Sequence, residues 1–138
     1  MSPGRVLALD PGERRIGVAI SDPLRITAQP LMVIDRNRQA PLDVIRQVVE
    51  TRDVDEIVVG LPIRLRGGEG PAAEAARRFA EEVEAATGLP VTLVDERFSS
   101  HTAERAMLEG GARRKTRREA RDKIAAAVIL RTYLERTT

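Results

Sequence analysis

The feature that most limits the fold of this chain is a strand, turn and strand pattern near its start. One apolar run ends at Asp10, and a second begins at Ile16. The pair Pro11-Gly12 between them favours a tight turn, so the pattern predicts an antiparallel hairpin over residues 6–21. A carboxylate inside a strand loses its hydration, whereas at the carboxyl end of the strand it meets water, ligands and metal ions. Asp10 is therefore a candidate functional residue, although Asp before Pro-Gly is also ordinary turn chemistry.

Length and composition favour one soluble, cytoplasmic domain. A chain of 138 residues can bury one hydrophobic core, so we expect a single domain over residues 1–138. The chain has no cysteine, which excludes disulfides and thiolate metal sites and fits a reducing compartment. No window contains the ~18 apolar residues that a membrane span needs, so we expect no membrane contact.

The net charge of +2 hides an uneven distribution of charged side chains. Residues 1–96 carry 12 basic and 16 acidic side chains, a net charge of −4, whereas residues 97–138 carry 11 basic and 5 acidic side chains, a net charge of +6. An acidic cluster beside a basic flank suits a metal-dependent enzyme that acts on a polyanion. The simpler alternative is that arginine only solvates surface helices, since 21 of the 23 basic residues are arginine.

Hydrophobic periodicity and turn signals predict an α/β chain. The expected strands are 6–10, 16–21, 27–34, 56–60 and 91–96, and the expected helices are 40–51, 72–87, 100–108 and 113–136. The strands at 56–60 and 91–96 are apolar enough to be buried on both faces, whereas Pro30 is tolerable only at a sheet edge or a bulge. Helical crossovers require parallel pairing and the opening hairpins require antiparallel pairing, so we expect a mixed five-stranded sheet flanked by helices.

Four acidic side chains can meet at one edge of this sheet. Parallel strands bring their carboxyl ends to the same edge, where Asp10 ends the first strand and Asp95-Glu96 ends the last. Side chains alternate along a strand, so only one of Asp95 and Glu96 points the same way as Asp10. Asp122 lies where the basic start of the last helix meets small apolar residues, and it can reach this edge. The alternative for Asp122 is an ion pair with Arg118, one turn earlier.

Two or three carboxylates favour hard divalent cations, Mg²⁺ or Mn²⁺. Two such ions about 4 Å apart can activate water and stabilise the leaving oxygen of a phosphodiester. His101 could act near the nucleophile or the leaving group, although its position beside Ser99 and Ser100 is more typical of a helix-entry residue.

Four motifs occur in order along the chain: LDPGERRIGVA at residues 9–19, VGLP at 59–62, VDERFSS at 94–100 and DKIAAAVIL at 122–130. Together they resemble the YqgF/RuvX family of small bacterial proteins over nearly the whole chain. The resemblance implies a ribonuclease H-like fold related to Holliday junction resolvases. It also implies an endonuclease that processes the 5′ end of the 16S ribosomal RNA precursor, and some members are described as resolvases of four-way DNA junctions.

The resemblance assigns roles to acids already singled out. Matched motif by motif, the metal-binding catalytic acids would be Asp10, Glu96 and Asp122, with Mg²⁺ or Mn²⁺ as cofactor. Asp95 belongs to the same acidic pair and stays a fourth catalytic candidate. Arg97 would hold a phosphate or orient the carboxylates.

The loop after the second motif departs from the family pattern. Family members commonly have a stretch like Asn-x-Asp-Gly after Gly-Leu-Pro, whereas this chain has Ile-Arg-Leu-Arg-Gly at residues 63–67. Arg64 and Arg66 add capacity to bind phosphate. Leu61-Pro62 stands where junction resolvases supply a further acid, so cleavage is expected to be slower or to use fewer metal ligands.

Phosphate contacts are expected to dominate recognition of the polymer. The chain has only two Phe and one Tyr, so stacking of bases on aromatic rings is hardly available. We expect recognition of structured RNA, and possibly branched DNA, by shape and with steep salt dependence. The basic stretch at 113–121 behind Gly110-Gly111 is expected to act as a flexible clamp. The candidate phosphate-binding residues are Arg64, Arg66, Arg97, Arg113, Arg114, Lys115, Arg117, Arg118 and Arg121.

Two other classes of protein share parts of this pattern. The spacing of Asp10 and Gly17 also suits the phosphate-binding hairpin of sugar kinases and actin-like ATPases, but those proteins need a second domain for which 138 residues leave no room. A non-catalytic RNA-binding factor of ribosome biogenesis also fits the basic carboxyl-terminal part. RNA trimming needs only a monomer, whereas symmetric junction cleavage favours a dimer, so a monomer or weak homodimer is expected.

Overall fold

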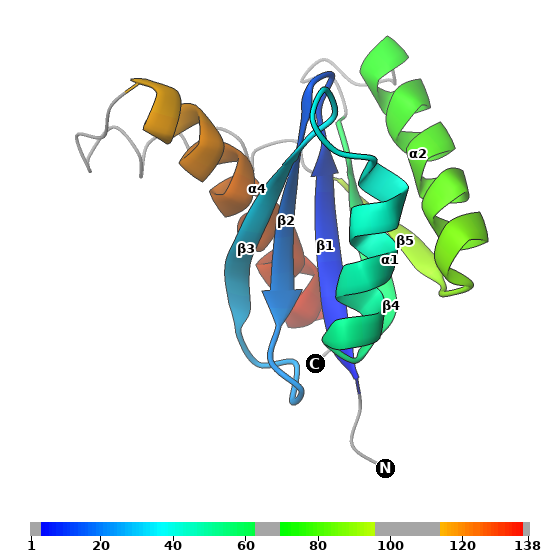
Figure 1. Cartoon of the computed structure of the whole chain (residues 1–138). Coiled ribbons are helices and arrows are strands. Elements are labelled where there is room, and N and C mark those ends of the chain that lie inside the picture. The colour runs from blue at the N-terminus through cyan, green and yellow to red at the C-terminus, as the bar shows by residue number, and fades with distance from the viewer. Residues whose placement is uncertain (1–3, 63–69, 96–113, 137–138) are drawn as a thin grey trace.

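The computed structural model describes residues 4–62, 70–95 and 114–136, which form one sheet between two helical layers (Figure 1). The sheet has five strands in the spatial order β3-β2-β1-β4-β5. These strands are β1 (Arg5–Pro11), β2 (Arg15–Ser21), β3 (Ala28–Asp35), β4 (Val54–Leu61) and β5 (Val91–Asp95). Helices α1 (Pro41–Thr51) and α2 (Pro71–Thr87) lie on one face, and α4 (Arg114–Arg136) crosses the other face.

Strand pairing confirms the expected mixed sheet. β2 runs antiparallel to both β1 and β3, whereas β4 runs parallel to both β1 and β5. Helix α2 makes the crossover between β4 and β5, as the strand-helix-strand pattern predicts. The carboxyl ends of β1, β4 and β5 therefore lie along one edge of the sheet.

Side-chain alternation divides the core into two layers. Leu7 and Leu9 of β1 pack into the layer beneath α1 and α2, whereas Val6 and Ala8 pack into the layer beneath α4. All four side chains are fully buried, because β1 is central and covered on both faces.

The edge strands explain one confirmed and one wrong prediction. Pro30 lies in edge strand β3, and the register of β2 against β3 shifts between Val18 and Ala19, where Pro30 pairs. Pro30 therefore has both the edge and the irregularity that a strand proline needs. The prediction that strand 91–96 is buried on both faces was wrong, because β5 is the other edge strand and only Val94 of its five residues is buried.

Helix ends follow their local signals. Pro71 opens α2, and Gly88 closes it in the left-handed conformation at φ 72°. Helix α4 confirms the expected helix at 113–136, so residues 114–121, also expected to act as a flexible clamp, form its first turns. The expected helix at 100–108 and the pair Gly110-Gly111 lie outside the described residues. None of the described helices has the length and hydrophobicity that a membrane span requires.

Candidate active site

The hairpin of β1 and β2 places Asp10 directly opposite Gly17. The turn is closed by the backbone N–H of Gly12, which donates to the carbonyl of Arg15 at 2.9 Å. Residues that pair across antiparallel strands point to the same face, about 4.5–5.5 Å apart at their Cα atoms. Asp10 continues the alternation of Val6 and Ala8, so Asp10 and Gly17 both face α4.

Gly17 allows α4 to touch the sheet at Asp122. A Cβ atom added to Gly17 would lie 2.0 Å from the carbonyl oxygen of Asp122 and 3.4 Å from its Cα atom. No side chain fits in that space, so only glycine permits this approach. Because Gly17 pairs with Asp10, the backbone of Asp122 lies one strand away from Asp10 on the same face of the sheet.

The sequence of α4 explains why Asp122 faces the sheet. Ala126, Ile129 and Leu130 follow it at helical spacing and are fully or almost fully buried beneath α4. Asp122 stands at the amino-terminal end of this buried stripe, and its side chain is 22% exposed. An acid at that point is close to the sheet without being sealed from water.

Arg15 holds the carboxylate of Asp122. The Nε–H of Arg15 donates to Oδ2 of Asp122 at 2.7 Å, and the arginine side chain is only 25% exposed. The two residues are 107 positions apart. Arg15 was not among the predicted site residues, although its place two residues before Gly17, on the same face of β2, was a usable signal. The expected partner Arg118 has a side chain outside the part of the chain that can be described.

Gly60 and the end of β5 complete this edge of the sheet. Leu9 pairs with Val59, and Gly60 pairs with Val94, so Gly60 lies between Asp10 and the end of β5. Strands two positions apart are separated by about 10 Å. Gly60 carries no side chain, so β4 puts no bulk between the two acidic strand ends.

Asp95 lies on the other face from Asp10. Val94 belongs to the core layer beneath α4, so the next side chain points toward the α2 side, where Asp95 is exposed. The structure therefore places Asp95 on the face away from Asp10. Glu96 and Arg97 lie outside the described residues.

The basic residues expected to bind phosphate are only partly described. Arg114, Lys115, Arg117 and Arg118 lie on the first turns of α4, and Arg121 precedes Asp122 and is half-buried. Arg64, Arg66 and Arg113 fall in the segments that are not described. The same helix therefore carries Asp122 and a basic amino-terminal segment.

The described residues include only two of the three expected metal ligands. Within residues 4–62, 70–95 and 114–136, no group of three potential ligands gathers around one point. Asp10 and Asp122 supply carboxylates on one face, and these oxygen ligands fit Mg²⁺ or Mn²⁺ rather than zinc. The third expected ligand, Glu96, lies beyond the described end of β5.

A family model described as RuvX: Holliday junction resolvase matches residues 4–136. The chain belongs to the RuvX family. Two curated relatives are named "putative pre-16S rRNA nuclease". The one from Koribacter versatilis is 48% identical over 134 residues, which cover 96% of this chain and 88% of the relative. The one from Listeria monocytogenes is 45% identical over 136 residues, covering 96% and 99%. The family resemblance predicted from four motifs is thus confirmed, and this RuvX member belongs to a family of nucleases.

The fold of this RuvX member is that of RuvC. The solved structure of Thermus thermophilus RuvC in complex with a Holliday junction substrate matches with a TM-score of 0.58 at 16% identity, covering 97% of this chain and 95% of RuvC. A second RuvC structure from the same organism matches with a TM-score of 0.55. The expected ribonuclease H-like fold is confirmed.

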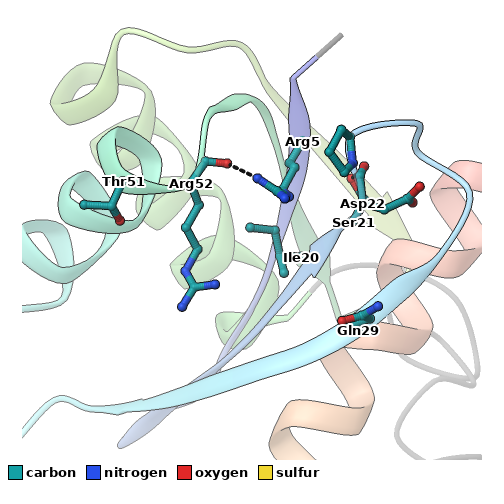
Figure 2. A pocket seen from close by; sticks show the side chains of 8 residues that line it. Arg5, Ile20, Ser21, Asp22, Gln29, Thr51 and Arg52 are labelled. Atoms are coloured by element: carbon teal, nitrogen blue, oxygen red, sulfur yellow. Dashed lines mark hydrogen bonds between the residues drawn. The ribbon is translucent and has the colours of Figure 1, made fainter. Parts of the chain in front are cut away.

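A separate pocket of 510 Å³ lies where β1 begins and α1 ends (Figure 2). It is lined by Arg5 and Arg52, and the Arg5 guanidinium donates to the Arg52 carbonyl at 3.0 Å. Asp22 also lines it, and a hydrogen bond from the backbone of Thr27 lowers the pKa of that carboxyl group. Arg5 and Asp10 are five residues apart on β1, about 17 Å, so this pocket is separate from the acidic edge.

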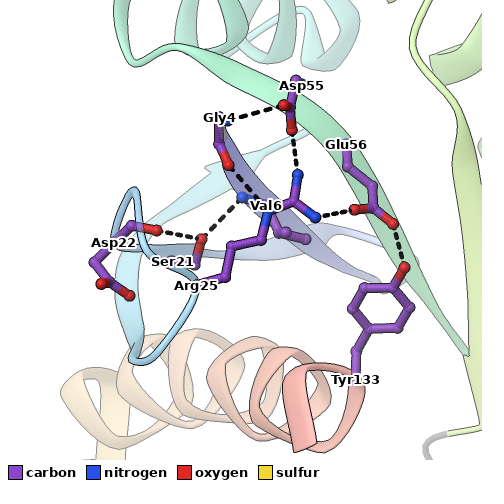
Figure 3. Close-up of polar contacts among 8 residues, drawn as sticks. All are labelled: Gly4, Val6, Ser21, Asp22, Arg25, Asp55, Glu56 and Tyr133. Atoms are coloured by element: carbon purple, nitrogen blue, oxygen red, sulfur yellow. Dashed lines mark hydrogen bonds and ion pairs between the residues drawn. The ribbon is translucent and has the colours of Figure 1, made fainter. Parts of the chain in front are cut away.

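A polar network beside that pocket joins three parts of the fold (Figure 3). Arg25, in the loop between β2 and β3, contacts Asp55 at 2.5 Å and Glu56 at 2.6 Å. The hydroxyl of Tyr133 in α4 donates to the same Glu56. Burial, followed by the bond to Glu56, raises the pKa of Tyr133. The network ties α4 to β4 far from Asp122, so it fixes the helix at its other end.

Proposed function

We propose that this RuvX member is a nuclease that uses Mg²⁺ or Mn²⁺ to hydrolyse phosphodiester bonds, and that it processes the 5′ end of the 16S rRNA precursor. The observation that carries the proposal is the contact of Asp122 with Gly17, one strand away from Asp10. Two acids from opposite ends of the chain thereby lie on the same face at the carboxyl edge of the sheet. The names of the relatives support the choice of ribosomal RNA.

Three carboxylates would hold the metal. Asp10 and Asp122 face the same side of the sheet, and if alternation continued past β5 it would bring Glu96, rather than Asp95, to that side. Arg15 donates to Oδ2 of Asp122 at 2.7 Å, so it would orient the carboxylate toward a metal ion. When bound, divalent ions would supply an activated water and stabilise the leaving oxygen.

The substrate strand would be held by arginine and lysine side chains. The segment from Arg114 to Arg121 precedes Asp122 on the same helix, so phosphates bound there lie next to the acidic edge. One guanidinium group can donate two parallel hydrogen bonds to two oxygens of a phosphate. Such contacts recognise the shape of the backbone rather than the sequence of bases.

A cleavage assay tests this proposal. Purified protein with Mn²⁺ is incubated with precursor rRNA fragments and, in parallel, with four-way DNA junctions. We expect Asp10→Asn and Asp122→Asn to lose cleavage while keeping their affinity for RNA, and Asp95→Asn to keep most of the cleavage. Asp53→Asn is the matched control, because Asp53 lies before β4 at the far end of the sheet and its left-handed φ of 53° tolerates asparagine.

Cleavage of neither substrate by the unaltered protein, with RNA binding intact, would leave a non-catalytic RNA-binding factor. Loss of cleavage in the Asp53→Asn control would show that the assay does not isolate the acidic edge.

Holliday junction cleavage is the second candidate function. The family model carries that description, and the fold is that of RuvC. Junction cleavage requires two strands to be cut symmetrically, so it predicts a homodimer, whereas RNA processing needs only a monomer. Sedimentation analysis of the protein with and without a junction separates the two states.

A further inference from the structure

A second pocket opens at the acidic edge, on the face opposite Asp122. It has a volume of 620 Å³ and lies between the β1–β2 turn and α2. Its lining includes Pro11 and Gly12 of the turn, Pro62 directly after β4, and Phe79 of α2. Since Pro11 directly follows Asp10, the pocket begins one residue from the proposed catalytic acid.

Charged side chains at this pocket balance one another. Arg36 and Arg78 contribute two positive charges, and Glu13 and Glu82 contribute two negative charges. Among the described lining residues the net charge is therefore zero, and the two carboxylates repel a phosphate group. Carboxylates accept hydrogen bonds from the amino groups of bases, and arginine donates to base oxygen and nitrogen acceptors. The polar groups therefore fit a nucleoside better than a phosphate.

Arg36 gives the pocket a fixed planar surface. Its Nε–H donates to the carbonyl of Gly12 at 3.0 Å, and its guanidinium lies 5.3 Å from the centre of the Phe79 ring. Phe79 itself is only 5% exposed, so a ligand meets the arginine rather than the ring. Unpaired bases stack on guanidinium planes as well as on aromatic rings. Base stacking was expected to be hardly available because only aromatic rings were counted, and Arg36 offers a guanidinium plane instead.

We infer that this pocket binds one unpaired nucleoside of the substrate strand, next to the phosphodiester that lies over Asp10 and Asp122. A strand that crosses the end of β1 passes from the acids on one face to the pocket on the other, over Pro11 and Gly12. The inference rests on the proposed nuclease function. It adds that cleavage requires a base that can leave its helix beside the cut, so a fully paired duplex is a poor substrate.

The test uses single-stranded oligoribonucleotides in which one abasic nucleotide is moved along the strand. Binding to Asp10→Asn protein is measured by fluorescence anisotropy. We expect one position beside the cleavage site at which the abasic nucleotide raises Kd about tenfold, since stacking of one base is of that size. Ala75→Leu adds bulk to an exposed lining residue of the pocket. We expect this variant to raise Kd for the intact strand by a similar factor. Its Kd should no longer depend on where the abasic nucleotide stands.

Matched controls distinguish an effect on the pocket from an effect on helix α2 or on the overall charge of the protein. Ala85→Leu makes the same change at an exposed position of α2 outside the pocket, and we expect binding like that of the parent protein. Arg36→Ala should reproduce the effect of Ala75→Leu, whereas Arg52→Ala at the far end of the sheet should not. Thermal unfolding verifies that each variant is folded.

The inference is overturned if abasic nucleotides have equal effects at every position, or if Ala75→Leu binds and cleaves like Ala85→Leu. Either result would assign the pocket to another ligand, such as a protein segment. Failure of the nuclease proposal is distinguishable, because the unaltered protein would then cleave nothing while the position-dependent binding of Asp10→Asn persisted.

Discussion

Replacement of Gly17 by alanine tests the contact on which the proposed site depends. The new Cβ atom would lie 2.0 Å from the carbonyl oxygen of Asp122, whereas real Cβ contacts are essentially never below 3.0 Å. Since 3.0 − 2.0 = 1.0 Å, α4 must withdraw from β2 by at least that distance at Asp122. The neighbouring backbone carbonyl belongs to a helix and cannot rotate away alone.

Two consequences follow for the Gly17→Ala variant. Overpacking of this kind costs about 1–3 kcal/mol, so we expect the free energy of unfolding to fall by that amount. A shift of about 1 Å in a catalytic group can lower the rate about 100-fold. We therefore expect Mn²⁺-dependent cleavage to fall by about two orders of magnitude in a protein that still folds.

A second variant, with a similar loss of stability but with α4 in place, separates the effect of α4 position on activity from the effect of stability. Val18→Ala removes buried methyl groups from the other face of β2, beneath α1, and is expected to cost about 2 kcal/mol without moving α4. Urea unfolding gives the stability of each variant, and cleavage of a precursor fragment gives its activity. The reasoning is refuted if Gly17→Ala loses no more activity than Val18→Ala, or if it is as stable as the parent protein.

Three further predictions concern charge. Arg15→Ala removes the cation beside Asp122, so we expect calorimetry to show Mn²⁺ binding about fivefold tighter. Cleavage at saturating Mn²⁺ should nevertheless fall, because the carboxylate is no longer oriented. Weaker Mn²⁺ binding would contradict this prediction. Tyr133→Phe removes the bond to Glu56 and should lower the free energy of unfolding by about 1 kcal/mol at neutral pH. The pKa of Tyr133 is raised in the folded state, so the parent protein should lose this contribution as pH rises above 10, and urea unfolding of Tyr133→Phe should lack that loss. RNA affinity should fall steeply with added salt in a binding titration, and a flat response would argue against phosphate contacts.

Local patterns were sufficient for most of the elements. Residues that are neighbours in sequence were enough to predict the hairpin, the edge or bulge position of Pro30, and the end of α2 at Gly88. Burial of β5 was predicted wrongly, because its apolar run does not reveal that it occupies an edge. The helix at 113–136 was predicted almost to its ends, whereas its basic first turns were expected to be a flexible clamp and are helical.

The sequence by itself determined that this chain forms a mixed α/β sheet, and it singled out Asp10 and Asp122, because apolar periodicity and the placement of acids at element ends are local properties. Only the tertiary structure decided that Arg15 holds Asp122 and that Gly17 provides the space for α4. Those contacts join residues more than one hundred positions apart. Their geometry depends on how a helix packs across a sheet, and no local pattern of residues specifies that packing.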